Sequence, residues 1–147
     1  MHMLHSNRSP SFYFIYFIAL GVLGSSTLFA QQLDHYRWKN RVLLIFAPDL
    51  PDNRLVDQLS LLDAERAGLA DRDLKVLVLT PKGNIEFSAA DSRHLYEVYK
   101  VGKETFMVIL IGKDGTAKLR TKQPIAPAVL FDTIDAMPMR QAEIKRK

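Results

Sequence analysis

The chain has 147 residues, 48% of them hydrophobic and 24% charged, and its formal net charge at pH 7 is +4. This length and composition are typical of a single folded domain and exclude a disordered or low-complexity chain. The sequence contains no cysteine, which excludes disulfide bridges, a lipid-modified amino-terminal cysteine and catalysis by a thiolate of this chain.

Residues 1–30 have the features of a secretory signal peptide. Arg8 precedes the unbroken apolar run "FYFIYFIALGVL" at residues 12–23, and small residues follow it. The run has the length of a signal-peptide core and is too short to cross a bilayer comfortably. We therefore expect cleavage after Ala30 and a periplasmic or secreted protein. The alternative is an uncleaved anchor at residues 12–30, and in both cases Arg8 stays inside and the domain faces outward.

The positive charge is concentrated at the carboxyl terminus. Residues 140–147, "RQAEIKRK", hold four basic side chains and one acidic one. This pattern predicts a folded domain at residues 31–140 and a solvated, frayed basic tail at residues 141–147, and it argues against nucleic acid as a partner. A membrane contact is expected only through an uncleaved signal segment.

Three continuous apolar runs predict a buried central sheet. "VLLIFA" at 42–47, "LKVLVLT" at 74–80 and "FMVILIG" at 106–112 lack the alternation of a strand with one wet face, so helices are expected on both faces. Between the first two runs, leucines at positions 55, 59, 62 and 69 form one helical stripe, with Asp52 as N-cap and Gly68 near the end of the helix. This strand-helix-strand unit predicts parallel strands.

The second half of the sequence predicts a helix, a hairpin and a closing helix. "DSRHLYEVYKV" at 91–101 has helical spacing, with Asp91 or Ser92 as its cap, and Asp-Gly at 114 and 115 signals a hairpin whose second strand is "TAKLRT". A closing amphipathic helix ends at Pro138 and has an apolar face formed by Val129, Leu130, Thr133, Ile134 and Met137. The order β-α-β-α-β-β-α is that of the thioredoxin-like fold, a three-layer sandwich with helices flanking a four-stranded mixed sheet.

Four segments together resemble a known family. "YRWKNRVLLIFAP", "LADRDLKVLVL", "LIGKDGTAKLR" and "LFDTIDAMPMR" are similar to a family of short secreted bacterial proteins with a domain of unknown function. Its peroxiredoxin-like domain, of the P-DUDES type, also occurs in animal extracellular-matrix and sushi-repeat proteins. The resemblance covers residues 33–140. It implies a thioredoxin-like fold and brings no activity with it.

The loop at residues 47–54, "APDLPDNR", stands where thioredoxin-like enzymes carry their redox cysteines. Its Pro48, Asp49, Asp52 and Arg54 include no thiol, hydroxyl or imidazole, so thiol exchange and cysteine-based peroxide reduction are excluded on this chain. We expect Asp49 and Asp52 to act at the start of the following helix rather than to bind a metal, and Arg54 to be a surface charge. The position of the fold's cis-proline holds Glu104 and Thr105.

A cluster of aromatic and basic residues precedes the first strand. Tyr36, Arg37, Trp38 and Lys39 have the chemistry of a surface that binds a partner protein or an anionic glycan. The other interpretation, which we favour from the sequence, is that Tyr36 and Trp38 cover one end of the core while the charged side chains face water. Neither His35 nor His94 has partners at the spacing of a zinc site or a catalytic triad.

The sequence favours an exported, non-catalytic binding or interaction module, for which we expect no catalytic residue, metal or cofactor. Two alternatives stay open. One is an enzyme with cysteine-independent chemistry that uses Asp49, Asp52 and Arg54 or His94. The other is a stress-related accessory that docks to another redox protein.

Overall fold

The computed structural model describes residues 33–146, so the predicted signal peptide lies outside the described residues. The elements in chain order are β1 (Arg41–Phe46), α2 (Asn53–Asp63), α3 (Arg66–Asp71), β2 (Leu74–Leu79), α4 (Ala89–Val98), β3 (Met107–Ile111), β4 (Ala117–Thr121), α5 (Pro127–Asp135) and α6 (Pro138–Ile144). The predicted order of strands and helices is confirmed, and the two short helices α3 and α6 are additional to it.

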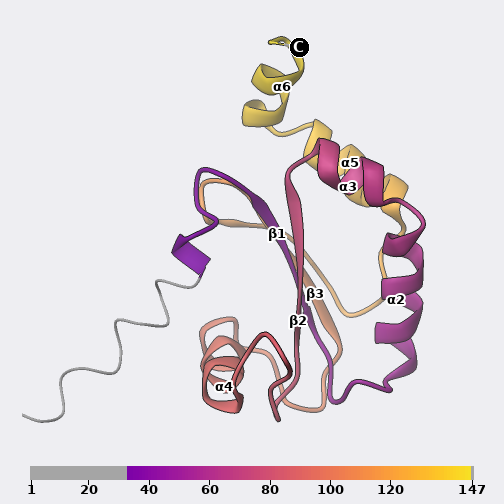
Figure 1. Cartoon of the computed structure of the whole chain (residues 1–147), viewed down its shortest axis with the longest axis vertical. Coiled ribbons are helices and arrows are strands. Elements are labelled where there is room, and N and C mark those ends of the chain that lie inside the picture. Colours follow the sequence, from indigo (N-terminus) through magenta and orange to yellow (C-terminus); the bar gives the residue numbers. More distant parts are fainter. Residues whose placement is uncertain (1–32, 147) are drawn as a thin grey trace, which may run out of the picture.

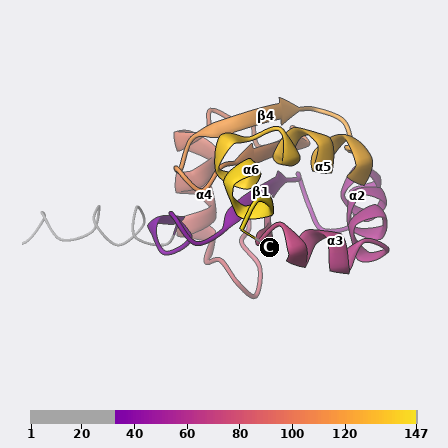
Figure 2. The same cartoon turned by 90° about the horizontal axis from the view of Figure 1, so that it is seen from above.

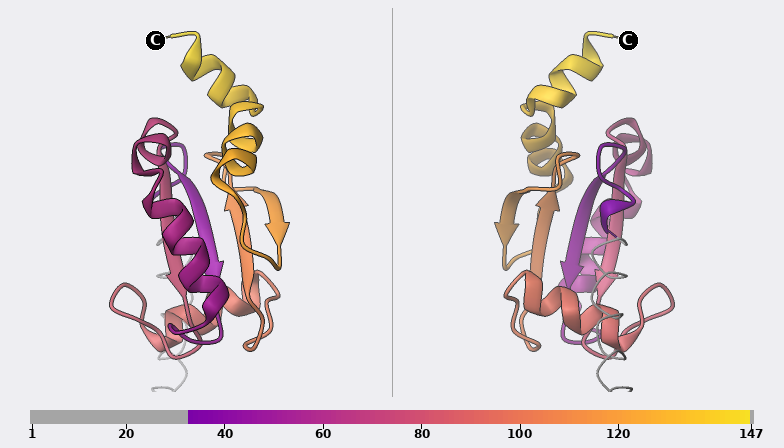
Figure 3. Two further views of the ribbon diagram at one scale, coloured as in Figure 1. Left: turned by 90° about the vertical axis from the view of Figure 1, so that its right-hand side faces the viewer. Right: turned by 90° about the vertical axis from the view of Figure 1, so that its left-hand side faces the viewer.

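The four strands form one mixed sheet in the order β2-β1-β3-β4. β1 and β2 are parallel, whereas β3 is antiparallel to both β1 and β4. Helices α2 and α5 lie on one face of the sheet and α4 on the other (Figure 1). α4 and α6 lie at opposite ends of the molecule (Figure 3). This is the α/β thioredoxin-like arrangement that the sequence predicts.

Strand β1 is buried on both faces because its side chains alternate between two apolar clusters. Val42, Leu44 and Phe46 pack in the cluster under α4, whereas Leu43 and Ile45 pack in the cluster under α2 and α5. All five residues of β3 are also buried. In contrast β2 is an edge strand with an exposed Lys75, so the expectation of full cover on both faces is wrong for that strand.

The first crossover contains two helices rather than one. α2 ends at Asp63 and α3 begins at Arg66, so Gly68 lies inside α3 instead of at a helix end. A Cβ at Gly68 would lie 2.7 Å from the ring of Phe131 on α5. The predicted stripe is therefore interrupted: Leu55 and Leu62 are buried, whereas Leu59 is exposed.

Two other helix boundaries differ from the predicted ones. α4 is capped by Ser88, whose hydroxyl accepts the Asp91 N–H at 3.1 Å, whereas the predicted cap Ser92 is buried inside the helix and donates to the Thr80 carbonyl. In the closing segment α5 ends before Pro138, and that proline begins α6 because proline suits the first turn of a helix. The expectation of a frayed terminus is therefore wrong for residues 141–144.

A buried glutamine ties α2 to the segment before α5. The Gln58 side-chain amide donates to the Ile125 carbonyl at 3.1 Å and its carbonyl accepts the Ile125 N–H at 2.7 Å. Gln58 has no exposed surface. These two hydrogen bonds satisfy the N–H and the carbonyl of Ile125, which is buried but lies outside the sheet. No helix within residues 33–146 is long and apolar enough to cross a bilayer.

Candidate functional site

The two candidate regions lie at opposite ends of β1. The loop at residues 47–54 follows the carboxyl end of this strand, where Phe46 pairs with Met107 and Leu79. The aromatic and basic turn precedes its amino end, where Val42 pairs with Ile111. A strand of this length holds the two regions roughly 20 Å apart, so they cannot form one small site.

At the loop, Asp52 caps helix α2 as predicted. Its Oδ1 accepts the Arg54 N–H at 2.9 Å, and its carboxylate also pairs with the Arg54 guanidinium at 3.1 and 2.7 Å. The hydrogen bond from the Arg54 side chain holds the pKa of Asp52 below its ordinary value of 3.8. Both oxygens of Asp52 are thus already used, which leaves little capacity for a cation.

Arg54 is more than a surface charge. Its guanidinium lies 5.3 Å from the ring centroid of Phe106, directly before β3, and it pairs with Asp52. Asp49 is exposed. The groove beside this loop, of about 610 Å³, is lined by apolar side chains with Asn84 and Glu86, and Pro48, Asp49, Asp52 and Arg54 are not among its lining residues. The groups named for cysteine-independent catalysis therefore do not converge in it.

Tyr96 is a buried hydroxyl that the sequence pattern does not reveal. From α4 it reaches the ends of two strands, and its Oη lies 2.7 Å from the Ala47 carbonyl and 3.0 Å from the Leu79 carbonyl. Burial raises the pKa of Tyr96 above its ordinary value of 10.0, so the group is neutral at physiological pH. Since it contacts two structural carbonyls, it anchors α4 to the sheet beside the loop at residues 47–54. Between residues 33 and 146, no group of three or more His, Asp and Glu side chains is placed to hold a metal ion.

At the other end, the turn before β1 presents Trp38 to solvent. Trp38 is 62% exposed, so the expectation that it covers the core is wrong, whereas Tyr36 does pack against the cluster under α4. The Arg37 guanidinium lies 5.5 Å from the centroid of the indole, and Lys39 is exposed beside it. An exposed, cation-stacked tryptophan is the residue type that dominates binding hot spots.

The backbone holds this tryptophan in an uncommon conformation. Trp38 has φ 65°, which a bulky residue adopts only where its surroundings impose it. Its N–H donates to the Lys113 carbonyl at 2.7 Å. The turn is therefore fixed against the β3–β4 hairpin, and the indole is presented without loop ordering on contact.

A groove of about 280 Å³ lies beside this turn and is lined by residues of both the turn and the hairpin. Its apolar lining comes from Tyr36, Tyr99 and the strand residues Val42 and Ile111, and polar groups surround them, including Arg37, Asn40, Asp34, Asp114 and Thr116. Gly115 has φ 81°, and a Cβ there would lie 3.3 Å from the Arg37 side chain, so glycine allows Arg37 to lie against the hairpin. The hydrogen bond from Lys118, then the one from the Thr116 N–H, lowers the pKa of Asp114 to about 2.

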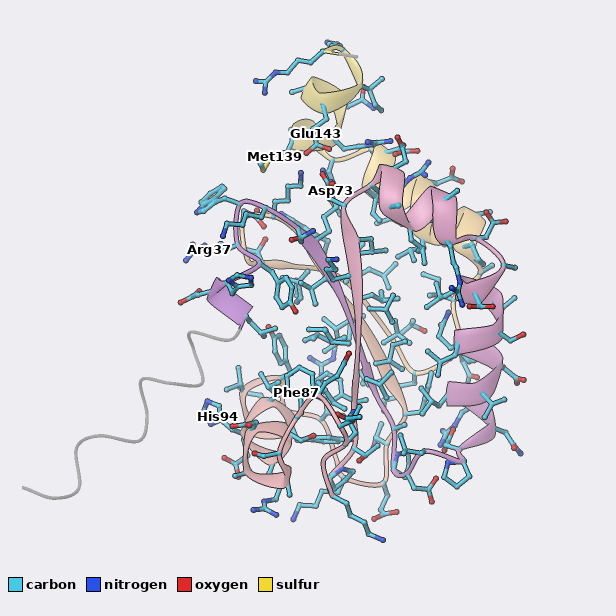
Figure 4. The ribbon with its side chains drawn as sticks, viewed as in Figure 1. Arg37, Asp73, Phe87, His94, Met139 and Glu143 are labelled. Atoms are coloured by element: carbon cyan, nitrogen blue, oxygen red, sulfur yellow. The ribbon has the colours of Figure 1, made fainter. Side chains whose placement is uncertain are left out.

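An ion-pair network joins this end of the sheet to α6. Glu143 pairs with the buried Arg41 at 3.2 Å and with Lys113 at 2.7 Å. Burial alone would raise the pKa of Glu143, but the hydrogen bonds from Lys113 and Arg41 outweigh it and hold the pKa below 4.5. Figure 4 shows Glu143, Met139 and Asp73 together at this end, far from Phe87 and His94 near α4. Lys113 therefore contacts both the Trp38 turn and α6.

Solved structures with a similar fold are peroxiredoxins. A reduced 2-Cys peroxiredoxin of Plasmodium vivax matches with a TM-score of 0.59 and 16% identity, over 76% of this chain and 84% of its own. The mitochondrial 2-Cys peroxiredoxin of Plasmodium falciparum matches with a TM-score of 0.54 and 12% identity, over 78% of this chain and 84% of its own. These similarities define the class: a peroxiredoxin-like, thioredoxin-fold domain, here without any cysteine.

The chain belongs to the family described as Domain of unknown function (DUF4174), whose model matches residues 32–143. Sushi repeat-containing protein SRPX2 of Rattus norvegicus is 29% identical over 124 residues, which cover 78% of this chain and 26% of the relative. Coiled-coil domain-containing protein 80 of Danio rerio is 27% identical over 133 residues, which cover 76% of this chain and 15% of the relative. The chain thus spans about a quarter or less of these relatives.

Proposed function

We propose that this protein is an exported, non-catalytic binding module whose contact surface is the turn formed by Tyr36, Arg37, Trp38 and Lys39 with the adjacent groove. The observation that supports it most is the exposed Trp38 in a fixed backbone conformation, stacked with Arg37. The cysteine-free redox position supports a role other than thiol chemistry.

The chemistry of this surface fits an anionic glycan. Arg37 and Lys39 supply positive charge, and the faces of Trp38, Tyr36 and Tyr99 offer flat apolar surfaces for sugar rings. Asn40 and Thr116 in the groove offer groups that pair with hydroxyls. A partner protein is the alternative outcome, and its test is a pulldown with the mature chain.

Dextran sulfate is a suitable first probe, with neutral dextran for comparison. We expect the mature chain to bind dextran sulfate with a change in Trp38 fluorescence, which is specific because the chain has one tryptophan. Trp38→Ala should weaken binding by about tenfold or more, as at a hot spot. Affinity is measured by calorimetry, since this variant lacks the fluorophore.

Lys39→Ala and Lys82→Ala form a matched pair for this measurement, because both lysines are exposed and lie at opposite ends of the sheet. Only Lys39→Ala should weaken binding. Equal losses in both variants would show that binding reports net charge and would overturn the proposed surface. If the wild-type chain captures a protein that the Trp38→Ala variant does not capture, the proposed contact surface stands and its ligand is a protein rather than a glycan.

Export is a separate part of the proposal and rests on the sequence of residues 1–30. We expect the chain recovered from a periplasmic or culture fraction to begin at Gln31, because Ala30 ends the small-residue segment after the apolar run. Intact mass measurement of the fractionated protein checks this. Recovery of the full-length chain from the cytoplasm alone would contradict export.

A further inference from the structure

Helix α6 buries no apolar side chain. Arg140 is its single buried residue, while Met139 and Ile144 are 38% and 44% exposed. In contrast α2, α4 and α5 each bury leucine side chains in the two apolar clusters. α6 also lies beyond the end of the sheet rather than on one of its faces (Figures 1 and 2). The hydrophobic effect that attaches α2, α4 and α5 therefore contributes little to the attachment of α6.

Polar contacts attach α6 instead. Arg140 donates to the Asp71 carbonyl at 2.8 Å and to the Asp135 carboxylate at 3.0 Å, and its guanidinium also pairs with the Asp71 carboxylate. Glu143, one turn further along, pairs with Arg41 and Lys113. Charged groups on the helix thus meet opposite charges from β1, the hairpin and the end of α3.

Three of these groups, Arg41, Lys113 and Asp135, have a second partner outside α6. Arg41 also donates to the Arg72 carbonyl at 2.9 Å, and Lys113 pairs with Asp73 at 2.8 Å.

On the acidic side, Asp135 is also held by Arg72 at 2.6 Å. Removing α6 would leave Lys113 paired with Asp73, whereas Arg41 would lose its ion pair, keep its hydrogen bond to the Arg72 carbonyl and become accessible to water. Breaking a buried ion pair is costly when it leaves an isolated charge buried without water. Opening of α6 avoids that cost, because water reaches the groups that it uncovers.

We propose that α6 is an electrostatically held latch, which opens as a unit while the sheet and helices α2 to α5 stay folded. Opening uncovers Arg41 and Lys113 at the end of the sheet. It also removes Glu143 from Lys113, whose carbonyl fixes the Trp38 turn. The latch does not depend on the function proposed above, since it rests on the contacts of α6 alone.

Hydrogen exchange of the full mature chain tests the latch. We expect the exchange rate of the α6 amides to be insensitive to low concentrations of urea, because opening of α6 exposes little surface. The exchange rate of the β3 amides should instead follow the urea dependence of global unfolding. Ala142→Gly changes an exposed position inside α6 without touching an ion pair. It should raise α6 exchange about fivefold, and β3 exchange by a similar factor, because α6 is unfolded both in the open state and in the globally unfolded chain.

Ser60→Gly is the control, at an exposed position in α2, which packs on the core. It should raise exchange in β3 and in the rest of the domain through lower global stability, and leave the α6 opening unchanged. If α6 amides exchange only with global unfolding, or if Ser60→Gly accelerates exchange of α6 and β3 equally, α6 is an integral part of the fold and the latch is refuted.

Discussion

Phe46→Ala should lower the free energy of unfolding by about 3–5 kcal/mol, the range for a buried phenylalanine replaced by alanine. Phe46 has no exposed surface. Its ring meets Tyr96 edge-on at a centroid distance of 4.8 Å and lies 6.0 Å from Tyr99. The cavity cannot collapse easily, because Tyr96 is also held by two strand carbonyls. Urea denaturation of both proteins gives the difference.

Val98→Ala is the control for this substitution, since Val98 lies on α4 but is 54% exposed. It should change stability by no more than about 0.5 kcal/mol. A loss below about 1 kcal/mol for Phe46→Ala would mean that α4 moves into the space, and that the cluster beneath it is not rigidly packed. The expected loss is a large part of the total stability of a domain of this size.

Gln58→Met should cost about 2–4 kcal/mol. Methionine keeps the approximate volume but leaves both the N–H and the carbonyl of Ile125 buried without partners, and each lost partner costs roughly 1–3 kcal/mol. The same denaturation measurement checks it. Gln58 is a polar residue in otherwise apolar surroundings. Burial of apolar surface alone would therefore predict that methionine at this position raises the free energy of unfolding.

Gln123→Met provides the matched control, because Gln123 is exposed and its hydrogen bonds with Thr121 use backbone atoms. We expect no change beyond about 0.5 kcal/mol. If Gln58→Met is equally neutral, water or a backbone shift satisfies Ile125, and Gln58 does not set the position of the segment before α5.

The sheet could be predicted because its strongest signals are local. The apolar runs of β1 and β3 are continuous, which is the pattern of strands covered on both faces, and Asp114 with Gly115 marks the hairpin. Helix boundaries were less accurate. Gly68 was expected to end a helix, but its position inside α3 serves close packing against Phe131, a contact between distant segments that no local pattern contains.

The candidate sites likewise combine features that local sequence predicts with features that depend on contacts between distant segments. Capping by Asp52 follows from its place before the helix and is confirmed. The exposure of Trp38 could not be predicted, because it depends on a positive φ that the hydrogen bond from the Trp38 N–H to the distant Lys113 carbonyl stabilises. For the same reason the sequence places Glu143 in a solvated tail, although it pairs with groups from β1 and the hairpin.

The class of fold and the absence of thiol chemistry follow from the amino-acid sequence, since strand burial is encoded in neighbouring residues and the missing cysteines are a matter of composition. The tertiary structure alone decided which surface is available for contact and how the last helix is attached. Both depend on residues far apart in sequence, brought together at the amino end of β1. There the backbone of Lys113 fixes Trp38, and its ammonium group pairs with Glu143.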